Sequence, residues 1–211
     1  MIIKHLGNGI VAFEDFIPYT REQIDGWIER LEANSIPFGY QPISDDESMN
    51  SGGYKFTEAS KGTAPSRFNN FYWDGVSQED SDFVQMLERH LYLALVEYCK
   101  LFPLAISELT WRTQGHIAKY ESGQYIGPHS DCAIPYEGET FKPINLSPLY
   151  NTITSSITLN DGFDGGVLSF RTWGITHKPK FGTIIMYPSA YLGCHEVTPI
   201  NSGVRYSYLS W

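Results

Sequence analysis

Cysteine is scarce in this 211-residue sequence, which contains only Cys99, Cys132 and Cys194. Three widely spaced cysteines cannot form a disulfide framework, and they lack the close pairings of a cysteine zinc site. The first residues, 1–16, also lack the basic end, apolar stretch and small-residue cleavage site of a secretory signal. We therefore expect an intracellular, cytoplasmic protein in a reducing compartment.

Long hydrophobic runs are absent as well. The most apolar window, His90 to Ile106, is interrupted by Glu97, Lys100 and Pro103, whereas a membrane-spanning helix needs about 20 nearly uncharged residues. We expect no membrane partner.

Basic residues are few: 15 Lys and Arg stand against 24 Asp and Glu, for a formal net charge of -9. Nucleic-acid binding normally depends on clustered basic side chains, so nucleic acid is not an expected partner. Apolar residues make up 42% of the sequence and aromatic residues 15%, whereas only 18% of the residues are charged. This composition and length predict one globular domain with a full core, and exclude a wholly disordered chain.

The N-terminal part, residues 1–108, reads as mainly helical support around a mobile loop. Apolar residues three or four apart predict a helix from Thr20 to Asn34, with Thr20 as N-cap and Gln23 completing a capping box. A short strand, Gly9 to Phe13, precedes it, and a second helix from about Gln78 to Leu101 is apolar enough to lie against a sheet.

Residues 109–211 have the pattern of β structure, in short runs rich in Thr, Ile, Val, Tyr and Phe separated by turn residues. Such spacing favours a sandwich or barrel over a parallel sheet. The expected strands are Gly115–Tyr120, Thr152–Asn160, Val167–Phe170, Gly182–Tyr187, Gly193–Thr198 and Arg205–Trp211. The predicted fold class is α+β, with residues 1–211 forming a single domain.

One short motif carries candidate metal ligands. His129 and Asp131 stand two apart, so on an extended chain their side chains point to the same face. This spacing alone is weak evidence for a metal site, but a later strand-like run adds His195 as a third candidate ligand. Two imidazoles and one carboxylate form the facial triad of non-haem Fe(II) sites, which leaves metal positions open.

Arg205 opens the last predicted strand and has no evident carboxylate partner nearby in sequence. Burying an unpaired guanidinium is very costly, so an anionic co-substrate is its natural partner. The segment Thr198–Gly203 is rich in turn residues, and a strand–turn–strand arrangement would bring Arg205 into one cavity with His195.

These residues resemble the 2-oxoglutarate and Fe(II)-dependent dioxygenases, and among them the prolyl 4-hydroxylase-like branch. The likeness covers roughly Gly115 to Trp211, and the carrying residues are Tyr120, Tyr125–Asp131, Gly165–Phe170, His195–Pro199 and Arg205–Trp211. It implies a double-stranded β-helix, the jelly roll, with the N-terminal helices packed on one of its two sheets.

The resemblance also implies a role for individual residues. His129, Asp131 and His195 would ligate Fe(II), and Arg205 would bind the distal carboxylate of 2-oxoglutarate. Tyr120 and Thr158 match further co-substrate contacts, and Tyr125 matches a tyrosine near the substrate. The implied reaction consumes O2 and 2-oxoglutarate and yields succinate, CO2 and a hydroxylated substrate; ascorbate is allowed as an additional cofactor.

Hydroxylation of a prolyl residue in a peptide or protein is the favoured interpretation. Its groove could draw on Tyr125 and on the aromatic residues Phe68, Phe71, Tyr72 and Trp73, and two polar loops, Gln41–Ser66 and Tyr136–Tyr150, are expected to act as a mobile substrate lid.

Other functions stay open at this point. One is hydroxylation of a free amino acid or other small molecule, which needs a closed pocket instead of a groove. A jelly-roll binding module, or a metal-dependent isomerase that never uses O2, is an alternative of another class. The acidic charge and the lack of a second Arg soon after Arg205 disfavour the nucleic-acid demethylating branch. The oligomeric state is not predicted.

Overall fold

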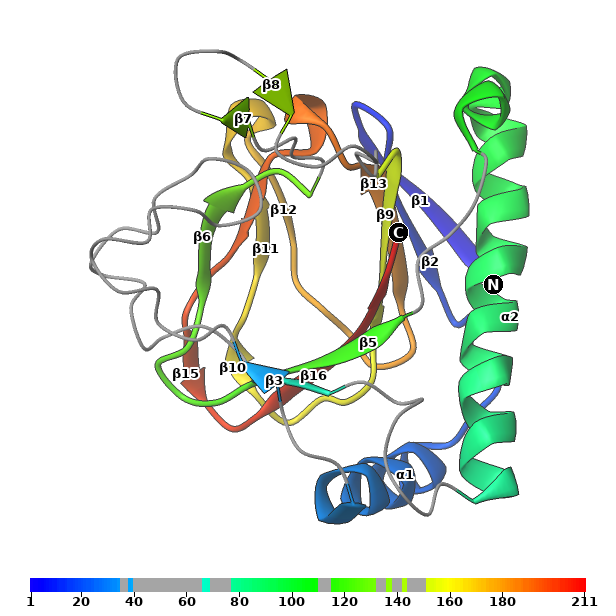
Figure 1. Ribbon diagram of the computed structural model, residues 1–211, viewed down its shortest axis with the longest axis vertical. Helices are drawn as coiled ribbons and strands as arrows, with labels where there is room; N and C mark the ends of the chain where they lie inside the picture. The colour runs from blue at the N-terminus through cyan, green and yellow to red at the C-terminus, as the bar shows by residue number, and fades with distance from the viewer. Residues whose placement is uncertain are drawn as a thin grey trace.

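A computed structural model describes residues 1–34, 38–39, 66–68, 77–109, 115–131, 136–137, 142–143 and 151–211. Within these ranges two antiparallel sheets face each other, and two helices lie outside the larger sheet (Figure 1). This arrangement confirms the predicted α+β jelly roll with the N-terminal helices on one sheet.

The larger sheet has eight strands and uses residues from both halves of the chain. In spatial order the strands are β1 (Ile2–Gly7), β2 (Ile10–Glu14), β13 (Ile184–Pro188), β9 (Ile153–Thr158), β16 (Arg205–Ser210), β5 (His116–Tyr120), β4 (Ser66–Phe68) and β3 (Phe38–Gly39). Neighbouring strands in this order pair antiparallel, and every residue of β9 is buried because a layer covers each of its faces.

The smaller sheet has four strands and lies across the interior from the larger one. Its order is β12 (Ile175–His177), β11 (Leu168–Phe170), β14 (His195–Val197) and β6 (Ile126–His129). Two further pairs of short strands lie outside these sheets: β10 (Asp164–Gly165) with β15 (Ile200–Ser202), and β7 (Tyr136–Glu137) with β8 (Lys142–Pro143).

Both predicted helices form, and their ends follow the expected capping chemistry. Helix α1 spans Arg21–Asn34, and its capping box is present: Gln23 N donates to Thr20 Oγ1 and Thr20 N donates to Gln23 Oε1. Helix α2 spans Gln78–Leu101 and is capped by Ser77, whose hydroxyl accepts from Asp80 N. Pro103 then begins a 3-10 helix, η2 (Pro103–Glu108).

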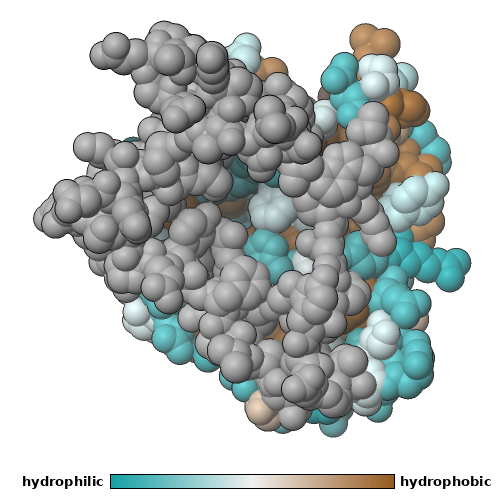
Figure 2. Space-filling model, in the orientation of Figure 1, coloured by the Kyte–Doolittle hydropathy of each residue, from teal (hydrophilic) through white to brown (hydrophobic). Residues whose placement is uncertain are grey.

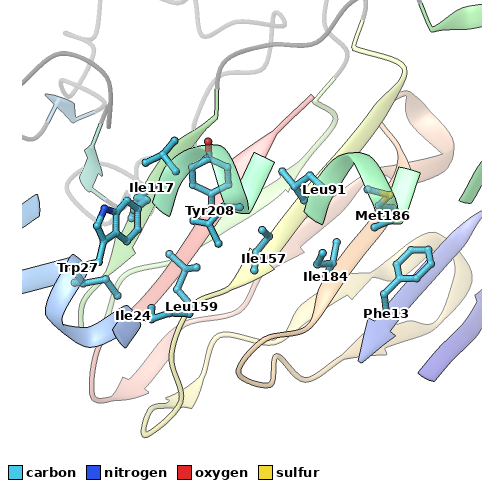
Figure 3. Packing of buried hydrophobic residues seen from close by; sticks show 14 of the residues in the cluster. Phe13, Ile24, Trp27, Leu91, Ile117, Ile157, Leu159, Ile184, Met186 and Tyr208 are labelled. Carbon is cyan, nitrogen blue, oxygen red and sulfur yellow. The ribbon is translucent and has the colours of Figure 1, made fainter. Parts of the chain in front are cut away.

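Two separate hydrophobic clusters fill the molecule. The first lies between the helices and the larger sheet, and Figure 3 shows Trp27 and Leu91 of the helices against Ile157, Ile184 and Tyr208 of the strands. The second lies between the two sheets and includes side chains from both, among them Tyr120, Ile185 and Tyr187 from the larger sheet and Leu168, Phe170 and Val197 from the smaller. The functional residues described below share this second interior.

A buried carboxylate fastens α2 to the larger sheet. Glu88 accepts hydrogen bonds from the Tyr208 hydroxyl of β16 and from the backbone N–H of Gly115, directly before β5. The side chain of Glu88 is buried, so the two donors offset part of its desolvation cost. The long helix is thereby tied to the two strands that also carry Tyr120 and Arg205.

The outer surface of α2 retains apolar residues. Tyr92, Leu93 and Val96 are exposed there, and Leu104 and Ile106 are exposed on η2; Figure 2 shows brown side chains along this edge of the molecule. No helix within the described ranges is long and apolar enough to cross a bilayer.

The strand predictions need some corrections. All six predicted C-terminal strands are present with ends shifted by up to two residues, but β1, β3, β4, β6, β7, β8, β10, β12 and β15 were not predicted. The segment Thr198–Gly203, expected to be a turn, includes β15, because Ile200 and Ser202 pair with β10. The glycines of this region permit the tight approach: a Cβ on Gly165 would lie 2.1 Å from the Pro199 carbonyl oxygen.

The proposed lid loops lie almost wholly outside the described residues. Of Gln41–Ser66 only Ser66 is described, as the start of β4. Of Tyr136–Tyr150, residues 136–137 and 142–143 are described, and they pair as β7 and β8. Phe71, Tyr72 and Trp73 also lie outside the described ranges, so the lid and the aromatic wall stay predictions.

His177, the last residue of β12, is a buried histidine whose protonation is coupled to stability. Burial, together with the positive charge of Arg205, lowers the pKa of His177 from its ordinary value of 6.5 to about 4. The unfolded chain therefore binds a proton near pH 6.5 that the folded chain accepts only near pH 4. Stability from this group is fully present above pH 6.5 and is lost as the pH falls toward 4.

Between pH 7 and pH 5 this histidine should cost the wild-type protein on the order of 2 kcal/mol of unfolding free energy, since one unit of pKa shift is worth about 1.4 kcal/mol. His177→Asn should have a shallower pH dependence, which chemical denaturation at both pH values measures. The packing cost of the substitution is present at both pH values and cancels in the difference. If wild type and His177→Asn lost the same unfolding free energy between pH 7 and pH 5, the assignment of this pH dependence to His177 would be contradicted.

Candidate active site

Three side chains gather at one end of the smaller sheet. Strands β6 and β14 pair so that His129 lies directly opposite His195, with ring centroids 4.4 Å apart. Asp131 follows the end of β6. One ligand atom from each of His129, Asp131 and His195 lies within 4.8 Å of the others. The structure therefore brings together the three residues that the sequence singled out.

Backbone carbonyls set the tautomers of the two histidines. Nδ1 of His129 lies 2.8 Å from the carbonyl oxygen of Gly127, and Nδ1 of His195 lies 2.9 Å from that of Gly193. A carbonyl oxygen only accepts, so each Nδ1 carries the hydrogen and each Nε2 keeps its lone pair as an acceptor. The two Nε2 atoms are 3.4 Å and 4.0 Å from the carboxylate oxygens of Asp131. Backbone carbonyls that bind Nδ1 in this way orient histidines so that Nε2 can bind a metal ion.

The local electrostatics favour the protonation states that metal binding requires. Burial, together with the neighbouring His129, lowers the pKa of His195 to about 4. Burial by itself would raise the pKa of Asp131, but His195, His129 and a hydrogen bond from Thr154 hold it below its ordinary value. At neutral pH the site therefore offers neutral imidazole nitrogen and an ionised carboxylate.

Arg205 lies in the same interior, at the start of β16. It is only 4% exposed, pairs across the sheet with Tyr120, and has its guanidinium carbon 5.3 Å from the centre of the Tyr120 ring. Nη1 donates to the Gly166 carbonyl at 3.0 Å, while Nε has no hydrogen-bond partner in the part of the chain that the structure describes. Burial lowers the pKa of Arg205, yet a guanidinium stays charged in proteins.

No carboxylate among the described residues lies within 4.0 Å of this guanidinium. A buried cation with an unpaired donor is costly, and an anion supplied by a ligand would remove that cost. Thr158 of β9 lies opposite Ser207 of β16 in the sheet register, and both side chains are buried. Within the described ranges, the Ser207 hydroxyl has no hydrogen-bond partner. The interior thus fits a ligand with a carboxylate at this end and metal-binding oxygens near His195.

Sequence analysis did not identify Ser207, Thr154 or Tyr187. Ser207 could have been found, because it stands two residues after Arg205 on the same strand and therefore on the same face. Thr154 Oγ1 donates to Asp131 Oδ2 at 2.7 Å, and the Tyr187 hydroxyl donates to His195 Nε2 at 3.0 Å. Nothing in the spacing of these two residues relative to the motif indicates the contacts.

Tyr125 is half-buried and directly precedes β6, at the opposite end of that strand from His129. Its role beside a substrate stays a prediction. Of the two cysteines adjacent to proposed ligands, Cys194 is a half-buried free thiol and Cys132 lies outside the described residues.

Comparison with known proteins assigns this half of the chain. Residues 115–211 match the model of the 2OG-Fe(II) oxygenase superfamily. A PKHD-type hydroxylase of Cupriavidus metallidurans is 30% identical over 129 residues, which cover 58% of this chain and 52% of the relative. The chain spans about half or less of the length of the curated relatives that it matches.

Solved structures share the fold over nearly the whole chain. A viral collagen prolyl hydroxylase from Paramecium Bursaria Chlorella virus-1, in complex with 2OG, is 16% identical with a TM-score of 0.55, covering 97% of this chain and 95% of that one. A prolyl hydroxylase from Trichoplax adhaerens, in complex with a hypoxia inducible factor peptide fragment, is also 16% identical with a TM-score of 0.62, covering 97% and 83%. At such identities the likeness concerns the fold.

The family match covers the segment that holds His129, Asp131, His195 and Arg205. The relatives and the shared fold agree with it. Residues 115–211 therefore match the 2OG-Fe(II) oxygenase superfamily, and the chain shares its fold with prolyl hydroxylases of known structure.

Proposed function

We propose that this chain is an Fe(II)- and 2-oxoglutarate-dependent dioxygenase that hydroxylates a prolyl residue in a peptide or protein. One observation carries the proposal: the buried, incompletely paired guanidinium of Arg205 lies in the same interior as the three converging ligands His129, Asp131 and His195. Neither feature alone specifies a dioxygenase, but a metal triad together with a site for a distal carboxylate supports one.

His129 Nε2, His195 Nε2 and one oxygen of Asp131 would hold the metal ion and leave positions open for other ligands. When bound, Fe(II) and 2-oxoglutarate supply the oxidation: 2-oxoglutarate and O2 become succinate and CO2, and one oxygen atom enters a C–H bond of the substrate. Binding the co-substrate in one orientation is the task of the residues on the larger sheet.

Arg205 would pair with the distal carboxylate of 2-oxoglutarate, and its unpaired Nε supplies a donor. Tyr120 packs beneath the guanidinium, while Ser207 and Thr158 line the same face as further hydroxyl donors. The apolar side chains between the sheets, including Phe170 and Val197, keep bulk water from this interior.

Arg205→Ala should weaken 2-oxoglutarate binding about a hundred-fold or more, because a buried carboxylate left without its counter-ion costs roughly 3–5 kcal/mol. Metal binding should change little. Tyr120→Phe should cost less, on the order of 1.5–3 kcal/mol. Calorimetric titration of the Mn(II)-loaded protein measures these affinities, and Arg21→Ala, which removes an exposed arginine that pairs with Asp161, is the control. Unchanged affinity in Arg205→Ala would remove this residue from the site.

The prolyl substrate is the less constrained part of the proposal. It is supported by the fold shared with prolyl hydroxylases of known structure, one of which is in complex with a hypoxia inducible factor peptide fragment. Proline in an extended segment has its φ already fixed, so a groove binds it at a small entropic cost. Hydroxylation of a free amino acid or another small molecule is the alternative within the same chemistry. A single domain and a cytoplasmic location belong to this proposal.

Substrate class can be tested by offering proline-rich peptides, free proline and other free amino acids side by side. We expect succinate formation and a gain of one oxygen atom, read by mass spectrometry, with a peptide. His195→Ala is the control for metal-dependent turnover. Turnover of a free amino acid with none of the peptides would overturn the peptide assignment and leave the dioxygenase chemistry standing, whereas 2-oxoglutarate turnover unaffected by His195→Ala would contradict the chemistry itself.

A further inference from the structure

Two hydroxyl side chains of the larger sheet reach across the interior to the proposed metal ligands of the smaller one. Thr154 of β9 and Tyr187 of β13 are direct partners in the antiparallel register. Both are buried. Thr154 donates to Asp131, whereas the Tyr187 hydroxyl hydrogen-bonds His195 Nε2 and also lies beside the Asp131 carboxylate. The contacts look equivalent but differ in the atom that they engage.

Thr154 belongs to a chain of hydroxyl groups with a defined direction. Its Oγ1 lies 2.7 Å from Asp131 Oδ2 and 2.8 Å from Ser189 Oγ. An ionised carboxylate only accepts, so the single hydroxyl hydrogen of Thr154 goes to Asp131, and Ser189 must be the donor in the second bond. Ser189 is fully buried, and its own carbonyl accepts from the Ser130 hydroxyl. The Thr154 hydroxyl therefore both donates and accepts a hydrogen bond with protein groups.

Asp131 depends on this contact because no strand ladder holds it. It lies in a bend just beyond the end of β6. The Asn151 side-chain amide bonds its backbone carbonyl at 2.8 Å, which fixes the main chain but leaves the carboxylate free to rotate. The Thr154 bond to Oδ2 fixes that rotation. Oδ1 then lies 3.4 Å from His129 Nε2, on the side where the ligand atoms converge.

Tyr187 differs because it bonds the ligand atom itself. Its hydroxyl donates to Nε2 of His195, the atom that a metal ion would take. A metal ion at Nε2 would displace this hydrogen bond, so Tyr187 does not hold His195 in place for metal binding; Gly193 does so through Nδ1.

We propose that Thr154 is a positioning residue for the metal site, which presents the Asp131 carboxylate to the ion through the Ser189–Thr154–Asp131 hydroxyl chain. This inference rests on the proposed function, in that it takes His129, Asp131 and His195 to be the metal ligands. Partners of this kind alter metal affinity 10- to 100-fold when removed.

The experiment is calorimetric titration of the whole protein with Mn(II), without O2 or co-substrate. Thr154→Val keeps the shape of the side chain and removes the hydroxyl, and it should weaken Mn(II) binding about 10- to 100-fold. Thr154→Ser restores a hydroxyl and should bind within about threefold of wild type. Tyr187→Phe removes the partner hydroxyl in the same register and should bind at least as tightly as wild type. Thermal unfolding without metal shows that each variant is folded.

Thr154→Val within twofold of wild type, or Tyr187→Phe weakened as much as Thr154→Val, would overturn the positioning role. An Asp131→Ala arm separates this result from failure of the site. If Asp131→Ala abolishes binding while Thr154→Val does not weaken it, the positioning inference alone is wrong. If Asp131→Ala binds Mn(II) as wild type does, the proposed metal site is wrong and the inference falls with it.

Discussion

The pairing of β6 with β14 is the constraint on which the site depends. It sets His129 opposite His195 and leaves Asp131 just beyond the strand end, so that His195 meets His129 and Asp131, which lie more than sixty residues earlier, within 4.8 Å. The carbonyl oxygens of Gly127 and Gly193, two residues before each histidine, fix both imidazoles through Nδ1. A shift of this register by one residue would turn a histidine to the opposite face of the sheet and remove the cluster.

The two faces of the larger sheet have different tasks. Its outer face packs on α1 and α2 through an almost wholly apolar cluster, which supplies the area burial that stabilises the fold (Figure 3). Its inner face places Arg205, Ser207, Thr158 and Thr154 among apolar residues, where unpaired polar atoms are costly. The area buried in the apolar layer offsets the cost of these buried polar groups, and the polar groups can then bind an anionic ligand and a metal ion.

Much of this could be predicted from the sequence, for identifiable reasons. Helical periodicity and capping chemistry are local, so α1, α2 and the Thr20 capping box were predicted closely. The ordered motif with His129, Asp131 and His195 located the ligand cluster. What escaped prediction depends on tertiary contacts: β1 and β12 are half-exposed strands stabilised by their neighbours, and the contacts of Thr154 and Tyr187 follow from sheet register, which spacing along the chain does not encode.

The central claim is that this cluster binds Fe(II) and leaves room for a chelating 2-oxo acid. Absorption spectroscopy of the protein with Fe(II) and 2-oxoglutarate, without O2, tests it most directly, because a 2-oxo acid chelated to Fe(II) gives a visible charge-transfer band. The account predicts this band in the wild-type protein and its loss in both His129→Ala and Asp131→Ala, with the exposed-residue variant Asp161→Ala retaining it. A full band in either ligand variant would contradict the account.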